Sequence, residues 1–188
     1  MKLILASGSP RRRELLGMVT ADFEVCASSF DERAVRADSP AALAGALARG
    51  KCLAVAAERP GCLVVGSDTV VELEGEVFGK PADAADARRM LRALSGRSHW
   101  VHTGVCASDG ARTESFVDSC RVTFFPIPDE EIERCIQSGE PFDKAGAYAI
   151  QGRAALWLDR LEGDYYTIMG LPVSRTARLL RSFELEER

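Results

Sequence analysis

A carboxylate, Asp68, stands inside an apolar stretch that has the composition of a buried strand. Residues 62–71 are rich in valine and the run is too short for a helix, so the pattern favours a strand. Burying a charge in a dry core costs several kcal/mol unless a cation, a metal ion or hydrogen bonds offset it. We therefore expect Asp68 at a strand end that opens on a polar cleft. The alternative is an aspartate that only turns the chain at that end.

Lysine is scarce in this chain. Of the 24 basic residues only four are lysines: Lys2, Lys51, Lys80 and Lys144. Because arginine supplies nearly all the other positive charge, we interpret the interior lysines as candidates for places where a compact ammonium group is needed. Chance is the alternative interpretation.

The first helix predicts a site for an anion. Ser9 suits an N-cap and Pro10 the first helical position, after an apolar strand at 3–6. Such a junction directs free backbone N–H groups and the positive end of the helix dipole at whatever lies above the strand. Three cationic side chains follow directly: Arg11, Arg12 and Arg13. Cations are the wrong sign for a helix N-terminus, so we interpret them as ligands for an anion, most simply a phosphate. Spacing does not tell which of them faces it.

The rest of the chain alternates strands and helices. An alanine- and leucine-rich helix at 41–57 carries Lys51, and two strand arms meet at Gly75 before Lys80. Asp109-Gly110 predicts a hairpin between two long strands. The loop-like stretch 140–152 mixes charged and amide groups with glycines, which is typical either of a ligand wall or of a surface connection. The other expected elements are strands at 23–27, 99–107, 113–125 and 155–158, helices at 82–94, 128–138 and 171–183, and a turn at 163–166.

Length and composition exclude several classes of protein. The 188 residues suit a single domain, 1–188, with one sizeable core. With 24 basic against 28 acidic side chains and a pI near 5.3, we expect neither a nucleic-acid nor a membrane partner. The apolar runs fall short of the roughly 18 residues that span a bilayer, and the N-terminus turns polar too soon for a signal peptide. A cytoplasmic location is therefore expected.

Cysteine and histidine offer little material for catalysis. The six cysteines are scattered and form no C-x-x-C pair, so we interpret them as reduced core thiols rather than zinc ligands. The two histidines, His99 and His102, lie three apart in a strand-like run and point to opposite faces, which makes them a poor ligand pair. A Ser-His-Asp or Cys-His catalytic site is not favoured.

Eight segments, taken together and in order, resemble the motifs of the Maf proteins, nucleoside triphosphate pyrophosphatases once described as septum-formation inhibitors. The segments are residues 5–12, Asp31-Glu32, Lys51, 66–71, 79–81, 143–148, 150–152 and 170–172. The resemblance covers nearly the whole chain. It implies an α/β fold in which helices flank a mixed twisted sheet and two lobes surround a central cleft, similar to the house-cleaning ITPases. A homodimer is compatible with the resemblance, and nothing else in the sequence indicates the oligomeric state.

The same resemblance implies roles for particular residues. Asp68 would be the catalytic proton acceptor that activates water, or would hold the metal beside it, and Glu32 would lie near that metal. The residues that would hold the triphosphate are Ser7, Arg12, Lys51 and Lys80. The residues that would set substrate specificity, in the branch acting on dTTP and UTP, are Arg11, Thr69 and Gln151. A sister branch that prefers 7-methyl-GTP carries glutamine after the catalytic aspartate, where this chain has Thr69.

Elementary chemistry agrees with these implied roles. Hydrolysis between the α- and β-phosphates needs an aligned water, a base, and cations that offset charge on the leaving pyrophosphate. Carboxylates such as Asp68 and Glu32 suit Mg²⁺ or Mn²⁺, so a divalent metal is the expected cofactor. The O4 acceptor and N3–H donor of uracil and thymine match the two groups of the Gln151 amide, and Thr69 can pack against a 5-methyl group.

The sequence therefore predicts a metal-dependent pyrophosphatase that converts dTTP, UTP and 5-modified pyrimidine triphosphates to the monophosphate plus pyrophosphate, which would sanitise the nucleotide pool. One alternative keeps the chemistry and changes the base to that of 7-methyl-GTP or another purine. A second alternative is a regulator of septum formation that binds nucleotides without hydrolysing them. Replacing Asp68 by asparagine would leave such a regulator unchanged.

Overall fold

The computed structural model describes residues 1–183, so residues 184–188 of the predicted domain lie outside the described part. Seven strands form one sheet in the order β2-β1-β3-β5-β6-β7, with β4 paired to β3. Pairing is parallel between β1 and its two neighbours and antiparallel elsewhere, so the predicted mixed sheet is confirmed. The strands are β1 (Lys2–Leu5), β2 (Glu24–Val25), β3 (Cys62–Leu73), β4 (Glu76–Phe78), β5 (Ser98–Ser108), β6 (Thr113–Phe124) and β7 (Leu158–Glu162).

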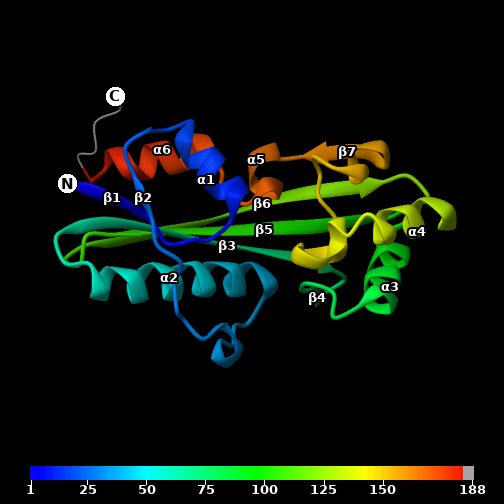
Figure 1. The fold of residues 1–188 in the computed structure, drawn as a ribbon, viewed down its shortest axis with the longest axis horizontal. Helices are drawn as coiled ribbons and strands as arrows, with labels where there is room; N and C mark the ends of the chain where they lie inside the picture. Colours follow the sequence, from blue (N-terminus) through cyan, green and yellow to red (C-terminus); the bar gives the residue numbers. More distant parts are fainter. Residues whose placement is uncertain (184–188) are drawn as a thin grey trace.

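Helices cover both faces of this sheet, as Figure 1 shows. The long strands β3, β5 and β6 run through an elongated molecule, with α2 along one side and α1, α5 and α6 along the other, while α3 and α4 gather at one end. This arrangement confirms the predicted fold class. The α-helices are α1 (Pro10–Gly17), α2 (Pro40–Glu58), α3 (Ala84–Leu94), α4 (Asp129–Gln137), α5 (Tyr165–Met169) and α6 (Val173–Arg181). Four 3-10 helices are η1 (Glu32–Ala34), η2 (Glu140–Asp143), η3 (Ala145–Ala147) and η4 (Arg153–Leu156).

The helix α2 lies unusually close to the sheet because two glycines face it. A Cβ atom on Gly104 would lie 2.3 Å from the carbonyl oxygen of Ala44, and one on Gly66 would lie 2.6 Å from that of Ala48. Real Cβ atoms do not approach so closely, so any side chain at either position would push α2 away. The close approach brings the second half of α2, including Lys51, over the middle of β3.

The same helix is, by length and composition, the one described helix that could cross a membrane, with 19 residues and a mean hydropathy of 1.2. Such composition also suits a helix packed on a sheet. Its apolar face does pack there: Ala44 and Leu47 form a buried cluster with Val70, and Cys52 and Val55 pack against Val64.

Two predicted elements near the C-terminus are wrong. The stretch 155–158 was expected as a strand, but the chain turns through η4 and begins β7 only at Leu158. Of the expected turn at 163–166, Tyr165 and Tyr166 instead begin α5, which Asp164 caps by accepting a hydrogen bond from the backbone N–H of Tyr166 at 2.9 Å. The aspartate that suggested a turn is therefore an N-cap, and a helix of only five residues has too little periodicity to be detected.

Candidate active site

The site is built around a gap in the pairing of β3. Strand β1 pairs with β3 only as far as Leu5 opposite Val65, where the backbone N–H of Ala6 adds one last bond, and β4 takes over at Val71. Between Val65 and Val71 no described strand pairs with this edge of β3. On its other side β5 pairs with β3 without interruption from Val64 to Glu72. Side chains from both faces of β3 can therefore reach one open space at the gap.

This gap corrects the expected position of Asp68. The residue lies in the middle of a continuous twelve-residue strand rather than at a strand end. What ends beside it is the neighbouring strand β1, which the sequence of β3 alone does not reveal. The polar cleft that the buried carboxylate requires is thus supplied by the topology of the sheet.

Lys51 joins two carboxylates at this gap. Its Nζ atom lies 2.5 Å from Oδ1 of Asp68 and 2.9 Å from Oε1 of Glu32. The side chains of Lys51 and Asp68 are only 14% and 12% exposed, so each charge offsets the desolvation of the other. The side chain of Glu32 is 52% exposed and faces open solvent. We call Lys51, Asp68 and Glu32 the lysine-centred cluster.

The segment before α2 brings Glu32 to this cluster. Phe30 and Val35 pack against the buried cluster of Ala44, Leu47 and Val70. These contacts hold both ends of segment 30–35 against α2. Between them, Asp31 caps η1 by accepting a hydrogen bond from the N–H of Arg33 at 3.1 Å. Glu32 is therefore held by local turn structure even though it is exposed.

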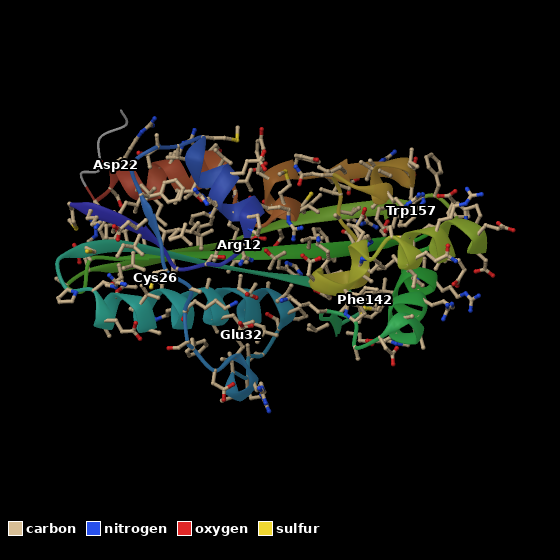
Figure 2. The ribbon with its side chains drawn as sticks, viewed as in Figure 1. Arg12, Asp22, Cys26, Glu32, Phe142 and Trp157 are labelled. Carbon is tan, nitrogen blue, oxygen red and sulfur yellow. The ribbon has the colours of Figure 1, made fainter. Side chains whose placement is uncertain are left out.

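On the other face of β3, Arg12 is held by three elements. Its Nε donates to the carbonyl oxygen of Gly170 at 2.9 Å, its Nη2 to Oγ1 of Thr69 at 3.1 Å, and its Nη1 to Oγ of Ser7 at 3.4 Å. Burial lowers the pKa of Arg12, while the Asp68 carboxylate opposes that shift. As predicted, Ser9 caps α1 and Pro10 begins it. Figure 2 labels Arg12 and Glu32 midway along the molecule.

The hydroxyl group of Thr69 is fully engaged within the protein. Thr103 Oγ1 donates to the carbonyl oxygen of Thr167 at 2.7 Å and lies 2.9 Å from Oγ1 of Thr69. Because the hydroxyl proton of Thr103 is used in that bond, Thr103 Oγ1 accepts the hydrogen bond from the hydroxyl of Thr69. The Thr69 hydroxyl oxygen in turn accepts from Nη2 of Arg12. Only the methyl group of Thr69 is left without a hydrogen-bonding role, so it is the part available for an apolar contact.

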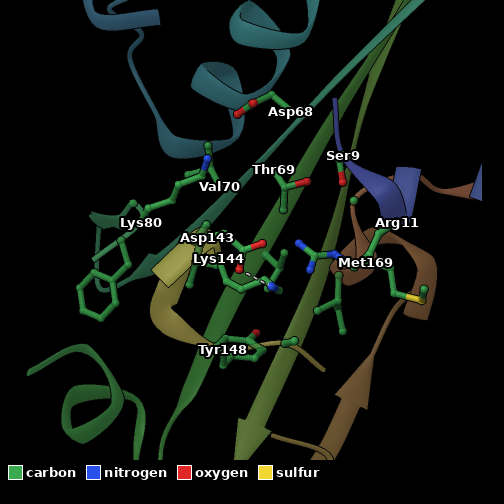
Figure 3. A pocket seen from close by; sticks show the side chains of 18 of the residues that line it. Ser9, Arg11, Asp68, Thr69, Val70, Lys80, Asp143, Lys144, Tyr148 and Met169 are labelled. Carbon is green, nitrogen blue, oxygen red and sulfur yellow. Dashed lines mark hydrogen bonds and ion pairs between the residues drawn. The ribbon is translucent and has the colours of Figure 1, made fainter. Parts of the chain in front are cut away.

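A cavity of about 450 Å³ opens at this gap, and Figure 3 shows its interior. Its volume falls in the range of small-molecule sites, roughly 300–1,000 Å³. Segments from all over the chain line it: the start of α1, the middle of α2, β3, the end of β4, η2 to residue 151, and the end of α5. Cations line it from several directions: Arg11, Arg12, Lys51, Lys80 and Lys144. The cavity therefore suits an anionic ligand.

The comparisons with known proteins agree with this geometry. A family model described as Maf-like protein matches residues 2–183. The chain belongs to the Maf family. A dTTP/UTP pyrophosphatase from Symbiobacterium thermophilum is 50% identical over 182 residues, which cover 97% of this chain and 94% of that protein. A dTTP/UTP pyrophosphatase from Bacillus velezensis is 45% identical and covers 98% of each chain.

The fold extends beyond the Maf family. A solved structure, titled as that of the Staphylococcus aureus Ham1 protein, matches with a TM-score of 0.58 over 97% of this chain and 100% of that one. At 13% sequence identity this likeness concerns the fold alone.

The Maf resemblance singled out nine site residues, and the structure brings eight of them to the cavity wall: Arg11, Arg12, Glu32, Lys51, Asp68, Thr69, Lys80 and Gln151. Ser7 is the exception, because it is buried behind Arg12, where its Oγ accepts from Arg12 and from the N–H of Ser9. Ser9 itself lines the cavity. The roles of all nine in binding and catalysis remain predictions.

Sequence reasoning assigned no role to two charged residues of this Maf site, Asp143 and Lys144. Both line the cavity, and the Lys144 ammonium donates to Oδ1 of Asp143. Lys144 is one of the scarce lysines, and both residues lie in the Maf-like segment 143–148. Their neighbours in the sequence do not predict which groups they face in the fold. Tyr148 also lines the cavity, resting on a buried aromatic cluster with His99 and Phe124.

The donor set can be tested for a metal ion. No group of three or more histidine, cysteine or acidic side chains with metal-binding geometry occurs among residues 1–183. Two carboxylates, Asp68 and Glu32, do converge on Lys51 beside the cavity. Mg²⁺ is commonly bound by one or two carboxylates together with substrate phosphates and water. The residues therefore fit an ion that is held jointly with a bound triphosphate.

Proposed function

We propose that this protein hydrolyses dTTP and UTP to the nucleoside monophosphate and pyrophosphate. The observation that carries the proposal is the buried Asp68 carboxylate, which Lys51 holds at the open edge of β3 in a cavity lined by cations. Relatives that are 41–50% identical over nearly the whole chain and are named dTTP/UTP pyrophosphatase support the same reaction. The reaction would remove these triphosphates from the nucleotide pool.

In this reaction a water oxygen bonds to the α-phosphorus while the bond from that phosphorus to the bridging oxygen breaks. The bridging oxygen leaves with the β- and γ-phosphates as pyrophosphate, and the water's proton passes to a base. Asp68 is the base in this proposal: Oδ1 is held by Lys51, and the other carboxylate oxygen can accept the proton. The ion pair fixes the orientation of a carboxylate whose side chain is only 12% exposed.

The cations of the cavity bind and orient the triphosphate. Lys51 and Lys80 each offer a compact ammonium group to one phosphate oxygen, whereas Arg12 can grip two oxygens with its planar guanidinium. Asp68 and Glu32 would hold a divalent metal, Mg²⁺ or Mn²⁺. When bound, such an ion offsets the charge that develops on the transferred phosphoryl group. The fixed cations contribute in the same direction because they need no reorganisation during the reaction.

Base preference follows from other residues of the cavity wall. The free methyl group of Thr69 can contact the 5-methyl group of thymine. Uracil carries a smaller hydrogen atom at C5, so it fits the same place. Arg11 and Gln151 line the same cavity and supply polar contacts for the base. This division assigns hydrolysis to the lysine-centred cluster and selection of the base to Arg11, Thr69 and Gln151.

A panel of nucleoside triphosphates tests the proposal. The protein is mixed with each canonical triphosphate, with 5-methyl-UTP and with 7-methyl-GTP, in Mg²⁺ and in excess chelator, and pyrophosphate is separated from orthophosphate. Pyrophosphate from dTTP and UTP, lost with chelator, is the expected result. Turnover only of 7-methyl-GTP would move the protein to the sister specificity. Nucleotide binding without any pyrophosphate release would favour the non-hydrolysing regulator.

A further inference from the structure

A second charge cluster lies in the cavity apart from Lys51. Lys144 donates to Oδ1 of Asp143, and Arg11 interacts electrostatically with the same carboxylate. In Figure 3 the side chains of Arg11 and Lys144 both point toward Asp143. We call these three residues the aspartate-centred cluster. The hydrogen bond from Lys144 in the first place, and Arg11 more weakly, hold the pKa of Asp143 below its ordinary value, so the carboxylate is ionised at neutral pH.

The backbone fixes this cluster rather firmly. Lys144 lies between η2 and η3 in extended conformation, with φ −118° and ψ 132°. The N–H of Gly146 donates to the carbonyl oxygen of Gly79 at 3.1 Å, which ties the segment to the end of β4. Gly146 has φ +72° and packs against Val71, and the buried Ala147 has φ 63°, a conformation that non-glycine residues seldom adopt. Strained backbone of this kind persists where surrounding structure enforces it, commonly in ligand-binding sites.

The cluster is open to a ligand. The side chain of Asp143 is 73% exposed, whereas that of Lys144 is 13% exposed and lies along the wall. All three members line the cavity. Because the carboxylate is exposed, its interaction with Lys144 adds little to stability, and a contact with a ligand can replace water on the free oxygen. Stability therefore gives no reason for these charges to lie together at the cavity wall.

The order of charges matches one edge of a nucleobase. Uracil and thymine present an acceptor, a donor and an acceptor along their pairing edge: O4, N3–H and O2. The aspartate-centred cluster offers the complementary groups, one acceptor (Asp143) that two donors (Arg11 and Lys144) both face. We propose that these three residues read the pairing edge of the substrate base, with the Asp143 carboxylate accepting from N3–H. This inference rests on the proposed function, because it assumes that the cavity holds a pyrimidine triphosphate.

The proposal predicts that the cavity disfavours cytosine. Cytosine carries an amino donor at position 4 and an acceptor at N3, so its N3 lone pair would face the Asp143 carboxylate and its amino group would face a cation. Sites that hydrogen-bond a specific donor reject an analogue lacking it more strongly than apolar sites reject a change of size. Asp143 and Lys144 are thus specificity residues, in addition to Arg11, Thr69 and Gln151.

The ratio of kcat/KM for UTP to that for CTP tests this assignment. An amide can accept from N3–H of uracil or donate to N3 of cytosine, so Asp143→Asn is expected to lower the ratio by about tenfold. Asp143→Glu, which keeps the charge, is expected to restore part of the ratio. Asp159→Asn is the matched control, because Asp159 is exposed on β7 and does not line the cavity. A role of Asp143 in folding alone would lower both activities together and leave the ratio unchanged.

The outcomes separate this inference from the proposed function. If the parent releases pyrophosphate from UTP and Asp143→Asn keeps the parent ratio, the base-reading assignment is wrong while the activity stands. If the parent releases no pyrophosphate from any triphosphate, the proposed activity fails. The inference is then decided by the dissociation constants of UTP and CTP, measured by calorimetry in chelator. An unchanged ratio of those constants in Asp143→Asn would overturn it, and a ratio moved toward CTP would support it.

Discussion

At one end of the cavity a cation contacts two carboxylates, and at the other a carboxylate interacts with two cations. The lysine-centred cluster pairs Lys51 with Asp68 and Glu32, while the aspartate-centred cluster pairs Asp143 with Lys144 and Arg11. The first order of charges can receive a divalent cation and a water proton. The second can receive a neutral base edge that alternates acceptors and donors. The two orders therefore suit different parts of one nucleoside triphosphate.

The clusters also differ in burial. Asp68 is 12% exposed and lies within a strand that β5 pairs from Val64 to Glu72, whereas Asp143 is 73% exposed at the end of a single 3-10 turn. A buried ion pair depends on both partners, since removing one leaves an uncompensated charge. An exposed cluster loses little when one member changes. Changes at the first end should thus affect rate and stability, and changes at the second should affect selection.

The largest effect is expected from Asp68→Asn. An amide cannot accept the proton of the attacking water, so pyrophosphate release from dTTP should fall by about 10²- to 10⁴-fold. Affinity for dTTP in chelator should remain, because the cations proposed to bind the phosphates are unchanged. Steady-state kinetics and calorimetry measure the two quantities. Asp159→Asn serves again as the control. If Asp68→Asn released pyrophosphate as fast as the parent, Asp68 would not be the catalytic base.

A second prediction concerns how the stability of the protein depends on pH through His99, which contacts the cavity residue Tyr148. His99 is buried, its Nε2 lies 2.7 Å from the hydroxyl of Tyr148, and burial lowers the pKa of His99 from 6.5 to about 4. Between pH 6.5 and 4 the unfolded state binds a proton at His99, whereas the folded state does not. The contribution of neutral His99 to the free energy of unfolding is therefore present above pH 6.5 and is lost as the pH falls toward 4. The loss amounts to about 3 kcal/mol at about 1.4 kcal/mol per pKa unit.

Urea unfolding at about pH 7 and pH 4.5 measures this loss. In His99→Gln the difference in unfolding free energy between the two pH values should be smaller than in the parent. Other groups titrate in the same window, but they do so equally in both proteins. An equal loss in parent and variant would show that His99 titrates normally in the folded state.

A third prediction concerns how α2 places Lys51. Gly104→Ala puts a methyl group 2.3 Å from the carbonyl oxygen of Ala44, so α2 must shift and the unfolding free energy should fall by about 1–3 kcal/mol. Pyrophosphate release should fall as well, because the shift moves Lys51 relative to Asp68. Gly17→Ala is the control, since apart from its chain neighbours and the backbone of its own helix no atom lies within 4 Å of the added methyl group. A stable and active Gly104→Ala protein would contradict the close approach of α2.

The smallest effect is expected from Thr69→Ser. The hydroxyl group and its bonds to Arg12 and Thr103 are kept, and only the methyl group is lost. One buried methyl contact is worth about 0.8 kcal/mol, so the preference for dTTP over UTP should fall about fourfold. Competition between the two substrates measures the change. An unchanged preference would place the 5-methyl group away from Thr69.

Local signals in the sequence predicted most of the fold. Ser9 and Pro10 start α1, and Asp109-Gly110 lies in the turn between β5 and β6, because caps and tight turns depend on neighbouring residues. The continuity of β3 through Asp68 was not predicted, since it depends on where β1 stops. The start of β7 was missed because the 3-10 turn before it has the same small and apolar composition as a strand.

The candidate site divides in the same way. Asp68, Lys51 and Glu32 could be singled out from an unexpected charge, a scarce residue type and a family motif. Asp143 could not, because an acid beside a lysine in an irregular loop is ordinary, and its relation to Arg11 exists only in the folded chain. A buried charge such as Asp68 leaves a signal in the local sequence, whereas an exposed charge such as Asp143 does not.

The central claim is that the two ends of the cavity do separate work, and one comparison tests it directly. Pyrophosphate release from UTP and from CTP is measured for the parent, Asp68→Asn and Asp143→Asn under the same Mg²⁺ concentration. The account predicts that Asp68→Asn lowers both rates by the same factor, while Asp143→Asn changes their ratio by about tenfold and keeps turnover of the better substrate within about tenfold of the parent. Equal losses on both substrates in both variants would contradict it.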